Sequence, residues 1–495
     1  MFTILVVSIF SANFVHGKIY LSITTIIATL ILLALYCFKF KKFIVFIVGI
    51  VTIFIGFSSF YLQKTKFNSG DLDFVNNPVS GVIDSVSRSS YGREMVITNV
   101  KLNNKDVKVN CYVSLLQKEV LEDYNVGDLV VFIVKESVKV DFYNDEVPNA
   151  SSIKRNIKYQ LTTDAIEVSA SEQSLKIKLQ QRIKSNLEKG LDNDKANLMY
   201  SSLFGDKTDL NYMIKESFSA SGVAHFLAVS GLHVGLIVGI LMIILKLCKC
   251  NKYIKILVVS LFLLFYCYLC GWSASIVRAS IMSVILIGAP LLFSEYDTLS
   301  SISLAGIIIL CFNPCALFDV SFLLSFMCVF GITMFYQYLN KLLTKIHFNN
   351  ALSQILAISI ITNISTLFVM IYYFNEVSFI GILANILILP LFTFVFTIVF
   401  VVIMISLIVS YASSVLLMIN PIINLVTVLS NWFASVSVGI VPVKISFASV
   451  ILYSVVLFFL SKYNLKSPTV KFIAANILIL VLIAQILLNL KVFGI

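Results

Sequence analysis

The sequence lacks the motifs of two enzyme classes. No stretch fits the phosphate-binding loop G-x-x-x-x-G-K-[ST], so this chain is not expected to drive transport as an ATPase. It has only four histidines and no H-x-H-x-D-H cluster, so a dinuclear metal hydrolase cannot be built from its residues. We therefore expect no enzyme activity, no bound metal and no other cofactor.

Cysteine pairing is also unsupported, although the chain has nine cysteines. Cys111 is the only one between residues 62 and 215, so no disulfide can form within that region. Cys267 and Cys270 form a C-x-x-C pair in an apolar run, where packing is favoured over zinc binding.

Charged residues are scarce. They make up 13% of the chain, whereas 59% is hydrophobic and the mean hydropathy is +0.94. Apolar runs close to the length that spans a bilayer recur along the sequence. These properties predict a polytopic α-helical membrane protein.

The net charge of +11 is unevenly distributed. Residues 61–215 hold 21 basic and 21 acidic side chains, so the excess lies in the apolar parts, mostly at segment ends. This pattern indicates positive-inside orientation rather than a nucleic-acid patch. Lys39, Lys41 and Lys42 place the connection before the third apolar segment in the cytoplasm.

Four parts follow along the chain. Apolar segments at about 2–15, 19–38 and 43–61 come first, and roughly eight to ten more are expected near the C-terminal side. We predict N-terminal transmembrane segments in 1–61, an extracytoplasmic β-domain in 62–170, an amphipathic helical connector in 171–211 and a polytopic channel domain in 212–495.

The β-domain is predicted from alternating apolar and polar residues in "VSGVIDSV", "REMVITNV", "KDVKVNCYV" and "GDLVVFIV". Several short strands of this kind resemble the OB barrel. Such barrels often bind single strands on aromatic platforms, for which Tyr91, Tyr112 and Tyr124 are available. The balanced charge equally allows a scaffold role.

The connector is predicted to hold two helices. Residues 172–189 place Ile183 and Leu187 among apolar residues three or four apart, as expected for an amphipathic helix. It could lie on the lipid surface or pack on a neighbouring domain. A second helix is expected at about 193–204.

Polar residues interrupt the apolar segment "SASGVAHFLAVSGLHVGLIVGI". On an unbroken helix, His225, Ser230 and His233 could face one cavity. Because Ser230 and Gly231 weaken a helix, a discontinuous helix is the alternative. The histidines could line a polar path, form a hydrolytic pair with Ser230, or make structural hydrogen bonds.

Further polar residues recur in later apolar segments. Arg278 in "GWSASIVRAS" could snorkel to the interface, contact an anion, or pair with Asp319. Asp319 and Ser321 are expected at a helix start after the turn Asn313-Pro314. Asn385 and Pro390 suggest a kinked or half-length helix. Together these breaks favour a translocation path, with a transporter of a small anion or lipid-linked substrate as an alternative.

Several ordered motifs resemble the ComEC competence family. They are "SLFGDKTDL", "FSASGVAHFLAVSGLHVGLI", "VRASIM", "FDVSFLLSFMCVFGI" and "FIGILANILILPLF". The matching positions are Gly205, Asp206, His225, Ser230, Gly231, His233, Arg278, Ala279, Asp319, Ser321, Phe322, Ser325, Phe326, Asn385 and Pro390.

The resemblance implies a channel in the bacterial inner membrane that admits one strand of transforming DNA. It implies as partners single-stranded DNA, membrane lipids, an extracytoplasmic DNA receptor, a type IV-like pilus and a cytoplasmic helicase-like ATPase. A second copy of the chain is a further candidate. Many family members carry a C-terminal metallo-β-lactamase-like domain, but here the last residues are an apolar run. We therefore expect a short form whose second-strand nuclease is a separate polypeptide.

Overall fold

The protein is described from a computed structural model. It describes residues 9, 43–89, 92–103, 105–107, 109–115, 126–144, 147–169, 175–292, 295–346, 349–374, 380–436, 445 and 447–460. The segment predicted at 19–38, Tyr91 and Tyr124 lie outside these residues, as does the segment at 2–15 except for Ile9.

The chain forms two compact units, each of which is described by itself. The first contains Met1–Arg182 and Ser303–Asp319, and the second contains Ile183–Ile302 and Val320–Ile495. The boundary between them falls inside the predicted connector, because the helix over 193–204 belongs to the second unit.

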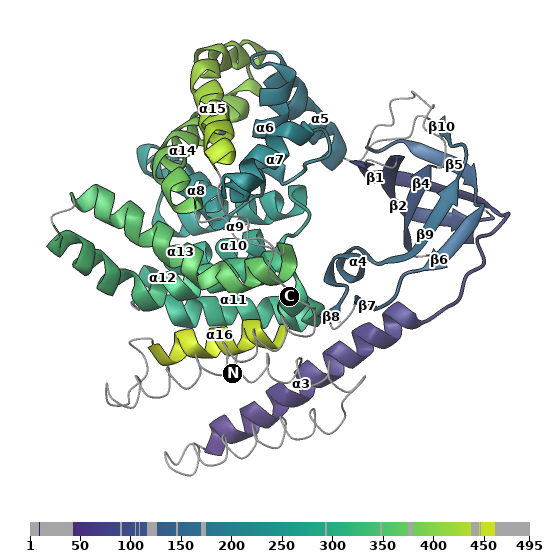
Figure 1. Cartoon of the computed structure of the whole chain (residues 1–495), viewed down its shortest axis with the longest axis horizontal. Helices are drawn as coiled ribbons and strands as arrows, with labels where there is room; N and C mark the ends of the chain where they lie inside the picture. The colour runs from purple at the N-terminus through teal and green to yellow at the C-terminus, as the bar shows by residue number, and fades with distance from the viewer. Residues whose placement is uncertain are drawn as a thin grey trace. The chain divides into compact units, whose positions relative to one another are not determined.

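Helix α3, Phe43–Asn68, begins the described part of the first unit (Figure 1). Its portion Val48–Asn68 is long and apolar enough to cross a membrane. The helix continues seven residues beyond the predicted end at 61, and Gly70 with φ +82° follows it. The extra residues contain no glycine or proline, so nothing local stops the helix.

The β-domain is a sheet whose two ends are joined by the chain itself. Its strand order is β10-β5-β1-β2-β4-β9-β6, with β3 beside β2. The strands are β1 Pro78–Ser89, β2 Gly92–Leu102, β3 Lys105–Asp106, β4 Asn110–Leu115, β5 Leu129–Ile133, β6 Glu136–Lys139, β9 Ile157–Thr163 and β10 Glu167–Ser169. A separate hairpin pairs β7 Tyr143–Asn144 with β8 Val147–Pro148.

Closure follows from β5 and β6, which only two residues separate. Strand β5 pairs antiparallel with β1, and β6 pairs antiparallel with β9. Strands β4 and β9 pair in parallel, so the ladder runs from β1 through β2, β4 and β9 to β6. From β6 the chain leads directly back to β5, which pairs with β1. A β-domain is thus confirmed, and its closed path supports the OB assignment, which itself stays a prediction.

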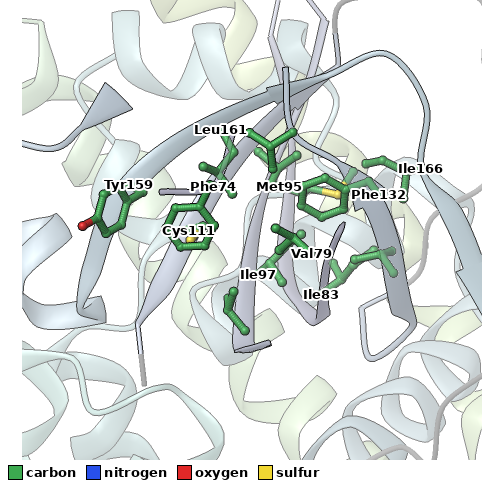
Figure 2. Close-up of a cluster of buried hydrophobic side chains, with 14 of the residues drawn as sticks. Phe74, Val79, Ile83, Met95, Ile97, Cys111, Phe132, Tyr159, Leu161 and Ile166 are labelled. Carbon is green, nitrogen blue, oxygen red and sulfur yellow. The ribbon is translucent and has the colours of Figure 1, made fainter. Parts of the chain in front are cut away.

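The core of the β-domain combines side chains of the predicted alternating strands with Phe74, Ile166 and, from β9, Tyr159 and Leu161 (Figure 2). Phe74, Ile83, Ile97 and Cys111 are all fully buried in it. A Cβ at Gly81 would meet the Ile97 side chain at 2.1 Å, at a register shift of β1 against β2. A glycine is therefore required where β1 bends.

Strand β9 is hydrogen-bonded to the end of α3 through a buried lysine. The Lys158 ammonium donates to the carbonyls of Lys66 at 2.7 Å and Ser69 at 3.1 Å. Its side chain is 7% exposed, and burial lowers its pKa. The Tyr159 hydroxyl accepts from the Leu72 amide and donates to the Gly70 carbonyl. The β-domain thus caps one carbonyl of the last turn of α3, that of Lys66, and bonds those of Ser69 and Gly70 just after the helix.

A second contact in this unit comes from a distant part of the chain. Gln63 donates to the Asn313 side chain at 3.0 Å and accepts from the Cys315 amide at 3.3 Å. Asn313 precedes the 3₁₀ helix η3, Pro314–Phe318, which confirms the predicted turn. The rings of Phe60 and Phe318 are 6.4 Å apart.

The second unit consists of helices. Their bounds are α6 Asn193–Phe204, α7 Tyr212–Ala220, η1 Ala224–Leu227, α8 Gly231–Leu247, α9 Lys252–Leu269, α10 Ala274–Gly288, η2 Ala289–Leu292, α12 Val320–Lys345, α13 Asn350–Phe374, α14 Gly381–Ser406, η4 Ser410–Met418, α15 Asn420–Val436 and α16 Phe447–Leu460. Helices α5, Leu175–Glu188, and α11, Thr298–Phe312, each run from one unit into the other, and α4, Ala150–Arg155, belongs to the first.

Six of the described helices are long and apolar enough to cross a membrane. They are α3, α9, α10, α12, α13 and α14, to which the pair η4 and α15, bent by 48°, could add a seventh. Helices α8 and α11 are apolar but shorter. The predicted class, a polytopic α-helical membrane protein with a β-domain, is confirmed.

The connector helices pack onto this unit at their C-terminal side. The predicted helix at 193–204 coincides with α6. In α5, Ile183 and Leu187 are buried, whereas Leu175 is 85% exposed. The Asn186 amide donates to the carbonyl and hydroxyl of Ser406. Packing on neighbouring helices therefore accounts for the C-terminal half of α5.

Replacing Lys158 by Met should loosen the joint between α3 and the barrel. The substitution removes two charge-assisted hydrogen bonds. Each such bond contributes about 1.5–3 kcal/mol to stability, and we expect the joint to lose no more than this per bond. Faster proteinase K cleavage between residues 68 and 73 of the full chain would show it. Lys101→Met, at an exposed position of β2, is the matched control. Equal cleavage of both variants would show that the hydrogen bonds of Lys158 do not hold the joint between α3 and the β-domain.

Candidate functional site

The segment before α8 is broken. Helix η1 ends at Leu227, and Ala228 and Ser230 are extended, with φ, ψ of −125°, 144° and −114°, 170°. Helix α8 then begins at Gly231. The unbroken-helix alternative is wrong and the discontinuous helix is confirmed, because the backbone leaves helical geometry just before the Ser-Gly pair.

His233 closes the start of α8. Its Nδ1 accepts the N–H of Ser230 at 3.2 Å, so this nitrogen carries no proton and the neutral ring is protonated on Nε2. The imidazole is fully buried and stacks on Phe396, with ring centroids 4.3 Å apart. Its Nε2 has no partner among the described residues. His233 thus caps the helix reciprocally, as in a capping box.

His225 has different surroundings. It lies in η1, is exposed, and its ring lies 4.2 Å from that of Phe226. That both imidazoles and Ser230 face one cavity stays a prediction. Since Nε2 of His233 bonds nothing in the described part and its Nδ1 takes a backbone amide, no Ser230–His233 nucleophile pair is assembled.

Arg278 is buried on the second turn of α10. Only 5% of the residue is exposed, so the snorkelling interpretation is wrong. Nη1 donates to the Ser325 carbonyl at 3.1 Å, while Nε has no partner among the described residues. Within the described residues of this unit, no carboxylate pairs with the guanidinium.

Gly231 makes room for that guanidinium. A Cβ at this position would lie 2.7 Å from Nη2 of Arg278 and 3.7 Å from Cβ of Ala279. On the third helix, the Ser325 hydroxyl donates to that of Ser275 at 3.0 Å. The first turn of α8, the polar side of α10 and the start of α12 thus meet at one cluster, which we call the Arg278 cluster: Gly231, Ser275, Arg278 and Ser325.

Glycine contacts hold the broken segment on three sides. The Cβ position of Gly205, whose φ is +78°, lies 3.6 Å from the Val229 side chain. A Cβ at Gly381 would lie 3.2 Å from Cα of Gly222. With Gly231 against α10, the segment is fixed between the ends of α6, α10 and α14.

Helix α14 covers the break with one face. Asn385 lies on it, 8% exposed, and its Oδ1 has no partner in the described part. Phe392 lies seven residues further on the same face, stacked on Phe226 with centroids 4.4 Å apart. Pro390 is exposed, and α14 runs through it from Gly381 to Ser406, so the half-length alternative is wrong. Neighbouring groups can re-satisfy a backbone carbonyl freed by proline within a membrane helix.

The remaining predicted residues are more dispersed. Asp319 immediately precedes α12, as predicted, but belongs to the other compact unit, so its pairing with Arg278 stays a prediction. Ser321 lies on the first turn of α12. The rings of Phe322 and Phe326 stack with centroids 4.1 Å apart.

Asp206 serves the local fold. Its carboxylate accepts from the amide and the hydroxyl of Thr208, just after α6. This is an Asx turn, which ends one helix and redirects the chain toward the next.

Sequence reasoning missed three participants. Ser275 lies three residues before Arg278, which places both on one side of α10. Phe392 and Phe396 lie seven and eleven residues after Asn385, a spacing that marks one helix face. This spacing of Asn385, Phe392 and Phe396 does not stand out in the sequence, because α14 is apolar on every side.

Gly231→Ala should destabilise the helical unit. The new methyl group would overlap the Arg278 guanidinium, and overpacking of this kind costs about 1–3 kcal/mol. Gly235→Ala, one turn along α8, is the matched control because its Cβ would meet nothing within 4 Å. Thermal unfolding of the detergent-solubilised chains compares them, and equal melting temperatures would show that Gly231 is not required.

Comparison with known proteins identifies the family. The model of the family described as Competence protein matches residues 202–467. The chain is 28% identical to ComE operon protein 3 of Bacillus subtilis (strain 168) over 245 residues, which are 49% of this chain and 31% of the relative. It is 26% identical to Recombination protein 2 of Haemophilus influenzae over 212 residues, 40% of this chain and 27% of the relative.

The matched region thus spans less than a third of the length of these relatives. No solved structure matches. The family model covers more than half of the chain and includes the broken segment, the Arg278 cluster and α14. The chain therefore belongs to the ComEC-type competence protein family.

Proposed function

We propose that this chain carries single-stranded transforming DNA across the inner membrane of a bacterium. The path runs through the helices that meet at the broken segment. Residues 62–211 lie on the extracytoplasmic side, in agreement with the lysines at the α8–α9 connection and at the end of α12 under the positive-inside rule.

The observation that carries this proposal is a group of three buried polar atoms without partners among the described residues. They are Nε2 of His233, Nε of Arg278 and Oδ1 of Asn385, on α8, α10 and α14, and they are three of the seven such atoms in the described part of the chain. Each such atom costs about 1–3 kcal/mol in a dry interior. Irregular backbone at membrane depth, as at 228–230, is tolerated where it faces protein or water. A hydrated path satisfies both requirements.

The charge pattern suits transit rather than tight binding. The strand's phosphates need compensation, and a dense basic lining would hold them. Arg278 is a buried cation, whereas the β-domain region is balanced between acidic and basic residues. Weak successive contacts would let a strand move.

The proposal also includes a role for the β-domain and a set of partner proteins. A closed barrel of OB type could guide a strand or act as a scaffold. We propose an extracytoplasmic DNA receptor, a type IV-like pilus, a helicase-like ATPase and a separate nuclease as partners. Family membership supports these assignments.

Two alternatives are less favoured. A Ser/His hydrolase lacks its nucleophile–base hydrogen bond, as described for Ser230 and His233. A small-anion transporter would also use Arg278, but it would not affect transformation. Deleting the gene and measuring transformation frequency separates this alternative from the DNA channel.

Ser275→Cys should make uptake sensitive to a thiol reagent. In a hydrated path the new thiol is reached by a water-soluble methanethiosulfonate, and the attached group narrows the path. We expect labelling to lower transformation frequency at least about tenfold, as expected when a narrow pore is obstructed. Transformation is counted in the native host at equal protein levels.

Leu286→Cys is the matched control, because this residue lies on the same helix and is 52% exposed. Its labelling, like that of the wild-type chain with its own cysteines, should leave transformation unchanged. Complete labelling of Ser275→Cys with normal transformation would place the path elsewhere. Normal transformation without the gene would overturn the function itself.

A further inference from the structure

We infer that the Arg278 cluster binds a phosphate group at the N-terminus of α8. This deepens the proposed function, on which its assignment to a DNA strand rests. The binding group is a phosphate diester or inorganic phosphate, recognised by backbone amides and a guanidinium.

The first turn of α8 offers donors. Helix N-termini carry unsatisfied N–H groups and a partial positive charge. Here His233 takes the Ser230 N–H, and the amides of Gly231 and Leu232 have no acceptor among the described residues. With 17 residues, α8 is long enough for a substantial dipole.

Arg278 is the second and independent feature. Its guanidinium is aimed at this turn, since Nη2 lies 2.7 Å from the position of a Cβ at Gly231. Of its five donor hydrogens, those on Nη1 reach the Ser325 carbonyl, and Nε has no partner in the described part. The residue is 5% exposed, so the buried charge cannot be solvated at the surface.

The positive end of α8 and the Arg278 guanidinium repel each other unless an anion lies between them. A cation beside the positive end of a helix is unfavourable, whereas an anion there is favourable. Both features together therefore select a negative ligand. The Ser325 hydroxyl donates to that of Ser275, which leaves the Ser275 hydroxyl hydrogen as one further donor in the cluster.

Phosphate fits this donor set better than a smaller anion. Guanidinium forks bind two phosphate oxygens at once, and amides of a helix N-terminus bind a third. Gly231 allows Arg278 to approach the first turn of α8 closely, because a Cβ at this position would lie 2.7 Å from Nη2.

The test measures binding rather than transport. The full chain in lipid nanodiscs is titrated with inorganic phosphate at constant ionic strength, and its melting temperature is recorded. We expect a saturable rise for the wild-type chain, at least about tenfold weaker apparent affinity for Arg278→Gln and an intermediate loss for Arg278→Lys. An equal rise in Arg278→Gln, or none in the wild-type chain, would overturn the site.

Arg278→Lys guards against misfolding of Arg278→Gln, and Gly231→Ala, compared as its folded fraction, tests the geometry of the site. Gly231→Ala keeps the charge but displaces the guanidinium, so phosphate affinity should fall, while Gly235→Ala should bind as the wild-type chain does. Unchanged affinity in a folded Gly231→Ala variant would also contradict the geometry.

Two further probes identify the source of the phosphate. Competition by oligothymidylate, but not by its neutral methylphosphonate analogue, supports a strand backbone. Competition by phosphatidylglycerol in the nanodisc supports the same site with a lipid headgroup. Because the readout is binding, the site can fail while transformation still depends on the gene, or hold while transformation does not.

Discussion

The helical unit depends on one constraint: where its chain is not helical, the backbone N–H and C=O groups need hydrogen-bond partners in an apolar interior. Between η1 and α8 the backbone is extended, so its amides and carbonyls need partners that a helix would have supplied. His233 supplies one by accepting the Ser230 amide. Gly205, Gly231 and Gly381 allow close contacts with Val229, with the Arg278 side chain and with the Gly222 backbone, which fix the position of the segment.

Much of the fold could be predicted because its signals are local. Alternation gave the main barrel strands, and the helix at 193–204 was bounded by a cap residue before it and Gly205 after it. Strand β9 was missed because five of its seven residues are buried, which hides the two-residue period. Its parallel pairing with β4, on which closure depends, is a long-range contact with no local trace.

The candidate site was predicted as a set of residues and not as an arrangement. Arg278 and His233 are conspicuous because ionisable groups are rare in apolar runs. That Gly231 faces Arg278, while His225 lies on η1 against Phe226, depends on how the helices pack. Continuity of α14 through Pro390 likewise depends on its neighbours, because local propensity predicts a break there.

The buried Lys158 has a mechanical consequence for the β-domain. A domain joined to a membrane helix by a flexible leash samples a volume that grows with leash length. Here residues 69–72 are bonded to β9, and Lys139 of β6 contacts Asn68 and Asp71. The β-domain is therefore joined to α3 by bonds from two strands rather than by a flexible linker. A molecule bound to the β-domain would be held within a short reach of the end of the helix, and its effective concentration there would be higher than with a flexible linker.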